Sequence, residues 1–337
     1  MSLFALPRLR LAHLPTPVEP LPRLTAALGG GLELWVKRDD QTGLAFGGNK
    51  TRKLEYLMAE ARAHGARMVI TAGAAQSNHC RQTAAAAARL GLECLLVLVG
   101  PPGDPHPTGN RFLMHLFGAR FRWTTLASRD EDLQRAFREA WAEGKRPYLI
   151  PYGGSSPVGA AAYAYALEEL LVQQDFHPDV IVLASSSGGT QAGLVAGARL
   201  LGYRGRIIGI SVDAPAEILR SRVAHLASEV LDRLRAPGTI APEEVEVVDT
   251  YAEPGYGVLT EREEEAILLA ARTEGLLVDP VYTGRALAGL IDLVRQGAFA
   301  PGTRVLFWHT GGTPALLAEP YRAQVLDAAS RYNGDPS

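Results

Sequence analysis

Short apolar segments alternate with amphipathic helical stretches along most of this 337-residue chain. The apolar segments have the length of buried strands, and most are followed by a stretch whose apolar residues recur with a helical period. The predicted strands span residues 32–37, 68–71, 94–99, 148–151, 180–184, 207–212 and 305–309. The predicted helices span residues 78–90, 110–117, 158–174, 190–201 and 214–234, with another beginning at Lys50 and one more after residue 309. This order predicts an α/β fold of parallel-rich sheets flanked by helices.

The length of the chain predicts two domains, because single hydrophobic cores tend to stop growing at about 250–300 residues. Two blocks of strand–helix pattern meet near residues 153–159. We therefore expect a large domain formed by residues 1–50 and 164–337, a small domain formed by residues 51–163, and a cleft between them.

The charge and the cysteine content narrow the function classes. A net charge of −2 without a basic run disfavours nucleic acid and anionic membranes as partners and favours a small-molecule substrate. No apolar run reaches the ~20 residues of a membrane span, so no membrane association is expected. Cys80 and Cys94 are too few for a disulfide framework or a zinc cluster, which predicts a cytoplasmic protein without a metal site.

Lys50 is one of only four lysines, and it follows two glycines at the start of a predicted helix. Glycines permit backbone angles that are closed to other residues, so they can hold the amine at a helix start. A buried lysine can form a Schiff base with an aldehyde cofactor, which the permanently protonated arginine cannot do. The alternative is a glycine turn with a solvated lysine, and Lys53 is the nearest competing amine.

Residues 184–193, Ala-Ser-Ser-Ser-Gly-Gly-Thr-Gln-Ala-Gly, follow a predicted strand and open a predicted helix. Successive N–H groups, small hydroxyls and the positive end of a helix would form a phosphate cradle. The segment lacks the Gly-Lys-Ser/Thr ending of ATP-binding loops and the glycine spacing of a dinucleotide fingerprint. A phosphate monoester is therefore the expected ligand, and a plain strand-to-helix turn is the alternative.

Two further groups of residues carry polar chemistry. Residues 71–79 end a predicted strand and bring Ser77 and Asn78 to a helix start, where N–H groups could hold a carboxylate. Capping of that helix is the simpler interpretation, and it is compatible with binding. Tyr256 and Tyr282 lie in loops that contain glycine and could serve as acid–base groups in a cleft or only pack there.

Four motifs together resemble one enzyme family. They are Lys-Arg-Asp-Asp at 37–40, Gly-Gly-Asn-Lys-Thr-Arg-Lys-Leu-Glu at 47–55, Gln-Ser-Asn-His at 76–79 and Asp-Pro-Val-Tyr-Thr-Gly at 279–284. In this order and spacing they are similar to the D-cysteine desulfhydrase and 1-aminocyclopropane-1-carboxylate (ACC) deaminase family, from residue 14 to about 318. The resemblance implies the two-domain fold type II arrangement of pyridoxal-phosphate enzymes, as in the tryptophan synthase β chain, with the cofactor in the large domain.

The resemblance also implies a role for each motif residue and a homodimer. The catalytic residues would be Lys50, Ser77, Tyr256 and Tyr282. Pyridoxal phosphate would be held by Lys50, Asn78, Ser187, Gly188, Gly189, Thr190, Thr283 and Thr310, with Asn78 near its 3-hydroxyl. The substrate carboxylate would be bordered by Gln76, Ser77, Asn78 and His79.

Thr283 and Thr310 bear on the choice of substrate, because ACC deaminases of this family are expected to carry Glu and Leu there. A carboxylate near the pyridine nitrogen would keep that nitrogen protonated and help to open an unactivated ring. A threonine hydroxyl leaves it closer to neutral, which suffices when a good leaving group departs from Cβ. Thr310 is the first choice for the nitrogen partner, although Thr283 could take that place.

The expected reaction is therefore α,β-elimination of D-cysteine to pyruvate, hydrogen sulfide and ammonia. Within the enzyme class, the alternatives are ACC deamination and elimination from L-cysteate or D-3-chloroalanine. A noncatalytic phosphometabolite-binding protein is the alternative from another class. Lys50 argues against it, because phosphate binding alone needs no buried amine.

Overall fold

The structure, a computed structural model, describes residues 4–102 and 106–333. The strands are β1 (Val18–Pro20), β2 (Glu33–Arg38), β3 (Met68–Ala74), β4 (Glu93–Val99), β5 (Arg120–Thr124), β6 (Pro147–Leu149), β7 (Val180–Ser185), β8 (Arg206–Ser211), β9 (Glu246–Val248) and β10 (Arg304–His309). The α-helices are α1 (Pro22–Ala27), α2 (Asn49–Ala63), α3 (Asn78–Leu90), α4 (Gly109–Leu116), α5 (Arg129–Ala142), α6 (Pro157–Gln173), α7 (Gly189–Leu201), α8 (Ala216–Arg233), α9 (Glu261–Glu274), α10 (Thr283–Arg295) and α11 (Tyr321–Asn333). Short 3-10 helices are η1 (Asp39–Gln41), η2 (Tyr152–Gly154), η3 (Pro242–Glu244) and η4 (Thr313–Leu317).

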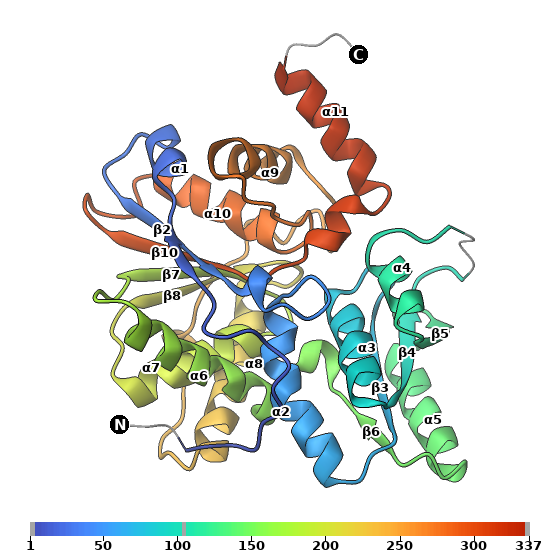
Figure 1. The fold of residues 1–337 in the computed structure, drawn as a ribbon. Coiled ribbons are helices and arrows are strands. Elements are labelled where there is room, and N and C mark those ends of the chain that lie inside the picture. The colour runs from blue at the N-terminus through green and yellow to red at the C-terminus, as the bar shows by residue number, and fades with distance from the viewer. Residues whose placement is uncertain (1–3, 103–105, 334–337) are drawn as a thin grey trace.

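Two separate sheets form the two halves of the molecule (Figure 1). The larger sheet has the strand order β1-β2-β10-β7-β8-β9, in which β1 is antiparallel to β2 and the other described pairs are parallel. The smaller sheet has the order β5-β4-β3-β6, and its described pairs are all parallel. The predicted α/β class with two parallel-rich sheets is confirmed.

The central strands read as continuous apolar runs because helices cover both faces of each sheet. In β7, Val180 and Val182 pack in the cluster that contains α9 and α10, whereas Ile181 and Leu183 pack against α6 and α7. Successive side chains of a strand point to opposite faces, which explains this division. In the smaller sheet, α2, α3 and α4 cover one face and α5 the other.

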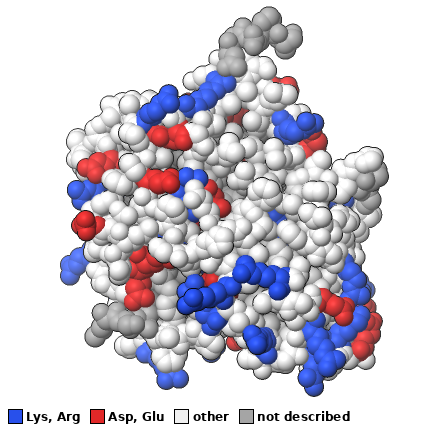
Figure 2. Space-filling model, viewed as in Figure 1, with Lys and Arg blue, Asp and Glu red and all other residues white. Residues whose placement is uncertain are grey.

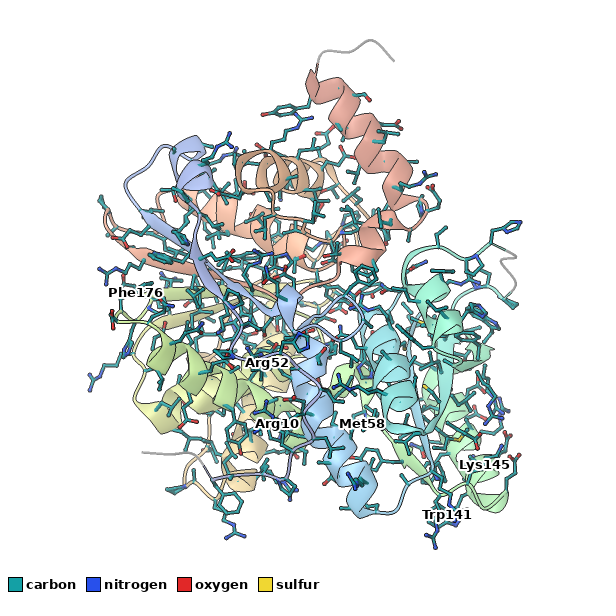
Figure 3. The ribbon with its side chains drawn as sticks, viewed as in Figure 1. Arg10, Arg52, Met58, Trp141, Lys145 and Phe176 are labelled. Carbon is teal, nitrogen blue, oxygen red and sulfur yellow. The ribbon has the colours of Figure 1, made fainter. Side chains whose placement is uncertain are left out.

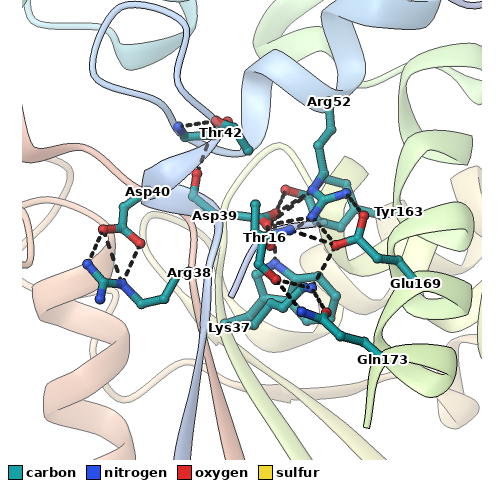
Figure 4. A network of polar contacts seen from close by, with 12 residues as sticks. Thr16, Lys37, Arg38, Asp39, Asp40, Thr42, Arg52, Tyr163, Glu169 and Gln173 are labelled. Atoms are coloured by element: carbon teal, nitrogen blue, oxygen red, sulfur yellow. Dashed lines mark hydrogen bonds and ion pairs between the residues drawn. The ribbon is translucent and has the colours of Figure 1, made fainter. Parts of the chain in front are cut away.

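The N-terminal half of α2 lies where the two sheets approach each other, and Figure 3 places Arg52 there, in the middle of the molecule. Arg52 is 3% exposed, and its Nε and Nη2 donate to the carboxylate of Asp39 at 3.0 and 2.9 Å. The same carboxylate accepts from the Tyr163 hydroxyl at 2.6 Å and from Trp308 Nε1 at 2.9 Å. Arg52 also reaches Glu169 of α6 at 2.9 Å (Figure 4). This network fixes the first turns of α2 against β2, β10 and α6.

The Lys-Arg-Asp-Asp motif at 37–40 therefore has a structural role. Lys37 is fully buried, and its Nζ donates to Glu169 at 2.6 Å, to Gln173 at 2.7 Å and to the carbonyl of Thr16 at 2.9 Å (Figure 4). Arg38 pairs with Asp40 at 2.8 Å beside this network. The four motif residues thus fix the end of β2 and the start of η1, which precede α2 in the chain.

The predicted strands and helices coincide with observed elements within a few residues, but several elements were not predicted. The elements missed are β1, β5, β9, α1, α5, α9 and α10, whereas α11 is the helix expected after residue 309. The strand β5 alternates arginine with aromatic residues at the edge of the smaller sheet, which gives it no apolar run. All strands of the smaller sheet lie within residues 51–163, while the domain boundaries themselves stay a prediction.

Charges of both signs are interspersed with uncharged surface on the face shown in Figure 2. In the described part of the chain, no helix is both long enough and apolar enough for a bilayer span. Among the same residues, no cluster of three or more His, Cys, Asp or Glu side chains could coordinate a metal ion.

We predict that the free energy of unfolding falls as the pH drops below about 4, and that Asp39→Asn weakens this dependence. Burial alone would raise the pKa of Asp39, but the charge and hydrogen bonds of Arg52 overcome it and lower that pKa. A lowered carboxyl pKa stabilises the fold above the unfolded-state value, and that stabilisation is lost as the pH falls through the folded-state value. Urea unfolding followed by tryptophan fluorescence between pH 7 and pH 3 measures both proteins.

At pH 7 the Asp39→Asn variant should lose about 3 kcal/mol, because it leaves the buried charge of Arg52 less compensated. Asp130→Asn is the matched control, because Asp130 pairs with Arg129 at 2.8 Å but its side chain is 80% exposed. That control should differ little from the wild type. Identical pH dependence in the wild type and Asp39→Asn would contradict the prediction.

Candidate active site

The turn before α2 presents Lys50 at the carboxyl end of β10. Gly48 has a φ of +123°, and a Cβ atom there would lie 3.1 Å from the carbonyl oxygen of Thr310. The N–H of Gly48 donates to the carbonyl of Asp39 at 2.9 Å, and that of Asn49 donates to Thr310 at 3.0 Å. Only glycine accommodates this backbone approach, so the glycine requirement inferred from the sequence has a steric cause.

The Lys50 side chain opens into a cavity between the two sheets. The residues that line this cavity are Asn49, Lys50, Ser77, Asn78, His79, Tyr152, Gly153, Ala184, Ser185, Ser186, Ser187, Gly188, Gly189, Thr190, Tyr282, Thr310 and Gly311. Burial lowers the pKa of Lys50 from 10.5 to about 8. A larger fraction of this amine than of an ordinary lysine is therefore neutral and nucleophilic near neutral pH.

The start of α7 forms one wall of the cavity. Its N-cap residue Gly188 has a φ of +81°, and no side chain caps this helix end. The first N–H groups of a helix lack partners within the helix, so those of α7 are available to an anion. Ser187 and Ser155 share a hydrogen bond of 2.8 Å between their hydroxyls, and Thr190 accepts one of 3.0 Å from Asn49. These N–H groups and hydroxyls lie together as a phosphate cradle would require, and phosphate binding itself stays a prediction.

Lys53 lies beside this cradle. Its Nζ is 3.5 Å from both the carbonyl of Gly153 and the hydroxyl of Ser155, and a Cβ at Gly189 would lie only 2.8 Å from it. Burial and the neighbouring charge of Lys50 hold the pKa of Lys53 well below its usual value. A phosphate at the start of α7 would supply the missing counter-charge. The sequence identified Lys53 only as a competing amine, and it assigned no role to Asn49 or Ser155.

The start of α3 forms the opposite wall. Ser77 is the N-cap, and its hydroxyl accepts from the N–H of Cys80 at 3.2 Å. Ser77, Asn78 and His79 all line the cavity. Ser77 therefore both caps the helix and lines the cavity, two roles that the sequence left compatible. The free N–H groups of this helix end suit a carboxylate.

The ring of His79 donates one hydrogen bond and keeps one acceptor nitrogen unpaired within the described structure. Its Nε2 lies 2.9 Å from the hydroxyl of Thr71, which donates its own proton to the carbonyl of Ile150 at 2.8 Å. Nε2 therefore carries the ring proton, and Nδ1 is a buried acceptor without a partner among the described residues. Burial, together with the charges of Lys50 and Lys53, holds the pKa of His79 well below its usual value. The backbone N–H of His79, rather than its ring, can thus serve a carboxylate.

Gln76 differs from its three neighbours in the motif. Its Nε2 donates to the carbonyl of Thr108 at 3.0 Å, and its Oε1 accepts from the N–H of Asn110 at 2.9 Å. Gln76 is not among the residues that line the cavity. It connects the α3 start to the α4 start, and its contact with substrate stays a prediction.

The two predicted tyrosines meet at the cavity rim. The hydroxyls of Tyr256 and Tyr282 lie 2.8 Å apart. The pKa of Tyr282 is raised well above its usual value, mainly by burial and also by the neighbouring Tyr256 hydroxyl. Tyr282 lines the cavity, whereas Tyr256 lines a wider groove that adjoins the cavity at Tyr152 and Ser187. The pair therefore connects the cavity with that groove.

The two predicted threonines occupy different positions. Thr310 follows β10 and lines the cavity. The hydroxyl of Thr283 donates to the buried carboxylate of Asp279 at 2.7 Å and accepts from the N–H of the same residue at 2.7 Å. Thr283 is fully buried and does not line the cavity. Of the two, Thr310 is the one that can meet a bound ring.

Comparison with known proteins gives a consistent picture. The sequence matches the family described as pyridoxal-phosphate dependent enzyme over residues 9–311. It is 44% identical over 319 residues to proteins named D-cysteine desulfhydrase from Salmonella choleraesuis (strain SC-B67) and Salmonella typhi, covering 93% of this chain and 96% of each relative.

Solved structures agree with this match. A crystal structure described as an ACC deaminase homologue superposes with a TM-score of 0.87 at 36% identity, covering 96% of both chains. An L-serine ammonia-lyase from Rhizomucor miehei superposes with a TM-score of 0.69 at 16% identity, covering 95% of this chain and 99% of that one, and shares the fold. The expected fold type II arrangement is confirmed. The chain belongs to the family of pyridoxal-phosphate dependent enzymes.

Proposed function

We propose that this protein is a D-cysteine desulfhydrase, a lyase that converts D-cysteine and water into pyruvate, hydrogen sulfide and ammonia. One observation carries the proposal: the amine of Lys50 shares a cavity with the N-termini of α7 and α3, whose N–H groups suit a phosphate and a carboxylate. The identity of 44% with D-cysteine desulfhydrases over most of both chains supports it.

The residues of the cavity fit pyridoxal phosphate. Lys50 would bond its aldehyde carbon, Ser187, Thr190 and the N–H groups of α7 would hold its phosphate, and Asn78 would donate to its 3-oxygen. The glycine at 189 supports this fit, because a Cβ there would lie 2.4 Å from Ser155 Oγ and fill the cradle. When bound, the cofactor supplies an electron sink that withdraws electrons from the substrate Cα.

The surrounding side chains would then perform the proton transfers. The N–H groups at the start of α3 and the Ser77 hydroxyl orient the substrate carboxylate. The neutral amine of Lys50 accepts the proton from Cα. The hydroxyl of Tyr282, protonated because of its raised pKa, donates a proton to the departing sulfur, and Tyr256 can restore that proton from the adjoining groove.

Thr310 is the residue that we assign to the pyridine nitrogen. Its position at the cavity wall supports this choice, and the engagement of Thr283 with Asp279 argues against the alternative. A neutral hydroxyl partner leaves the nitrogen largely unprotonated, which suffices for the loss of sulfide.

A cytoplasmic homodimer completes the proposal. Both cysteines are free buried thiols, as in proteins of reducing compartments. The family resemblance supports the dimer, and light scattering would distinguish it from a 36.1 kDa monomer.

Substrate comparison tests the assignment. With added pyridoxal phosphate, D-cysteine should give pyruvate and sulfide in equal amounts, and faster than ACC, L-cysteate or D-3-chloroalanine gives pyruvate. Faster turnover of ACC would establish the deaminase alternative. Absence of turnover with every substrate would favour a binding protein.

Lys50→Ala should lower kcat for D-cysteine by about 10³-fold or more, because it removes both the anchor and the base. Lys145→Ala is the matched control, since Lys145 pairs with Glu143 on the surface, and it should match the wild type. Sulfide release measured at saturating cofactor reports both variants. An active Lys50→Ala enzyme would refute the role of this amine.

Thr310→Val and Thr283→Val should separate a cofactor contact from a structural one. Thr310→Val loses a single hydrogen bond to the ring and should lower kcat by about tenfold with little change in stability. Thr283→Val removes one of several hydrogen bonds to the buried carboxylate of Asp279 and leaves the N–H of Asp279 without its acceptor, so it should cost about 1–3 kcal/mol in urea unfolding. The reverse pattern would assign the pyridine nitrogen to Thr283.

A further inference from the structure

Arg81 is a buried cation whose hydrogen bonds all go to neutral oxygens. Its side chain is fully buried, and Nη1 donates to Asn78 Oδ1 at 3.0 Å and to Asn110 Oδ1 at 2.7 Å. Nη2 donates to the carbonyl of Gly47 at 2.7 Å, and Nε has no partner in the described structure. Arg81 therefore joins α3 to the start of α4 and to the glycine turn before Lys50.

The two other buried arginines of the described chain both have carboxylate partners. Arg52 pairs with Asp39 at 2.9 Å, and Arg285 pairs with Glu263 at 2.9 Å. No carboxylate of the described residues lies within ion-pair distance of Arg81. Burial lowers the pKa of the Arg81 guanidinium to about 9, and the more distant charge of Asp279 partly opposes this shift. A buried cation without a counter-charge is unfavourable, so a bound anion nearby would be stabilised by it.

Asn78 connects Arg81 to the cavity. Its Oδ1 accepts from Arg81 Nη1 at 3.0 Å and from Asn110 Nδ2 at 2.9 Å, which fixes the orientation of its amide. With Oδ1 held by these two donors, Nδ2 is left free to donate, and Asn78 lines the cavity. A cation on the acceptor side of an amide strengthens the donor on the other side, because linked hydrogen bonds polarise one another.

We infer that Arg81 is a positioning residue that orients the amide of Asn78 and provides positive charge behind the 3-oxygen of bound pyridoxal phosphate. The inference rests on the placement of Asn78 in the proposed function. By favouring the ionised 3-oxygen, Arg81 sets the pH at which that oxygen loses its proton. The hydrogen bond from Arg81 to the carbonyl of Gly47 also links the guanidinium to the turn that precedes Lys50.

The ionisation of the bound cofactor tests this role without any turnover. The visible spectrum of the loaded enzyme is titrated with pH for the wild type and for two neutral variants, Arg81→Gln and Arg81→Met. These variants pack differently, so the failure of one to fold leaves the other. Arg81→Lys retains the charge, and Asn110→Ala removes the second donor to Asn78 while keeping Arg81. The affinity for pyridoxal phosphate and the Tm of the cofactor-free protein are measured in parallel.

We expect the neutral variants to raise the pH midpoint of the 3-oxygen by about one unit, because an opposite charge nearby lowers such a midpoint by about 1–3 units. Arg81→Lys and Asn110→Ala should stay closer to the wild type, and the neutral variants should bind pyridoxal phosphate about tenfold more weakly. A purely structural residue would lower Tm without moving the midpoint. Neutral variants with a wild-type midpoint would therefore overturn the inference.

Asn78→Ala separates this inference from the proposed function. If it moves the midpoint while the neutral Arg81 variants do not, Asn78 is correctly placed and only the role of Arg81 fails. If none of these variants moves the midpoint, the 3-oxygen does not contact Asn78, and that part of the proposed cofactor placement fails with the inference.

Discussion

The buried ion pair between Asp39 and Arg52 is the constraint on which the rest of the structure depends. Asp39 directly follows β2, and Arg52 lies in the first turn of α2. Tyr163 of α6 and Trp308 of β10 donate to the same carboxylate. The pair thus fixes the start of α2 against the larger sheet, while the rest of that helix packs in the core of the smaller one. Because Lys50 lies within this anchored turn, its position is determined from both halves of the molecule.

Positive charge gathers at the cavity. Lys50 lines it, Lys53 and Arg81 are buried beside residues that line it, and no carboxylate of the described chain forms an ion pair with any of the three. The N-termini of α3 and α7 add partial positive charge from two sides. An amino acid and a phosphorylated cofactor together bring a carboxylate, a phosphate and an ionisable ring oxygen, which matches this arrangement.

The sequence predicted the parts of the site that depend on local patterns. The glycine turn before Lys50, the strand-to-helix loop at 185–190 and the cap at Ser77 all lie at helix starts, where short-range signals are strong. The contacts of Lys53, Ser155 and Arg81 were not predictable, because each joins segments far apart in the chain. Thr283 and Thr310 could not be separated either, since the burial of Thr283 against Asp279 appears only in three dimensions.

The most direct test of the central claim is to locate the covalent anchor of the cofactor. The enzyme loaded with pyridoxal phosphate is reduced with borohydride, digested, and mapped by mass spectrometry for the peptide that carries the pyridoxyl group. We predict the label on Lys50 and none on Lys53, although the two amines lie in consecutive turns of α2. Label on Lys53 in place of Lys50, or no label after saturation with the cofactor, would contradict the assignment of the site.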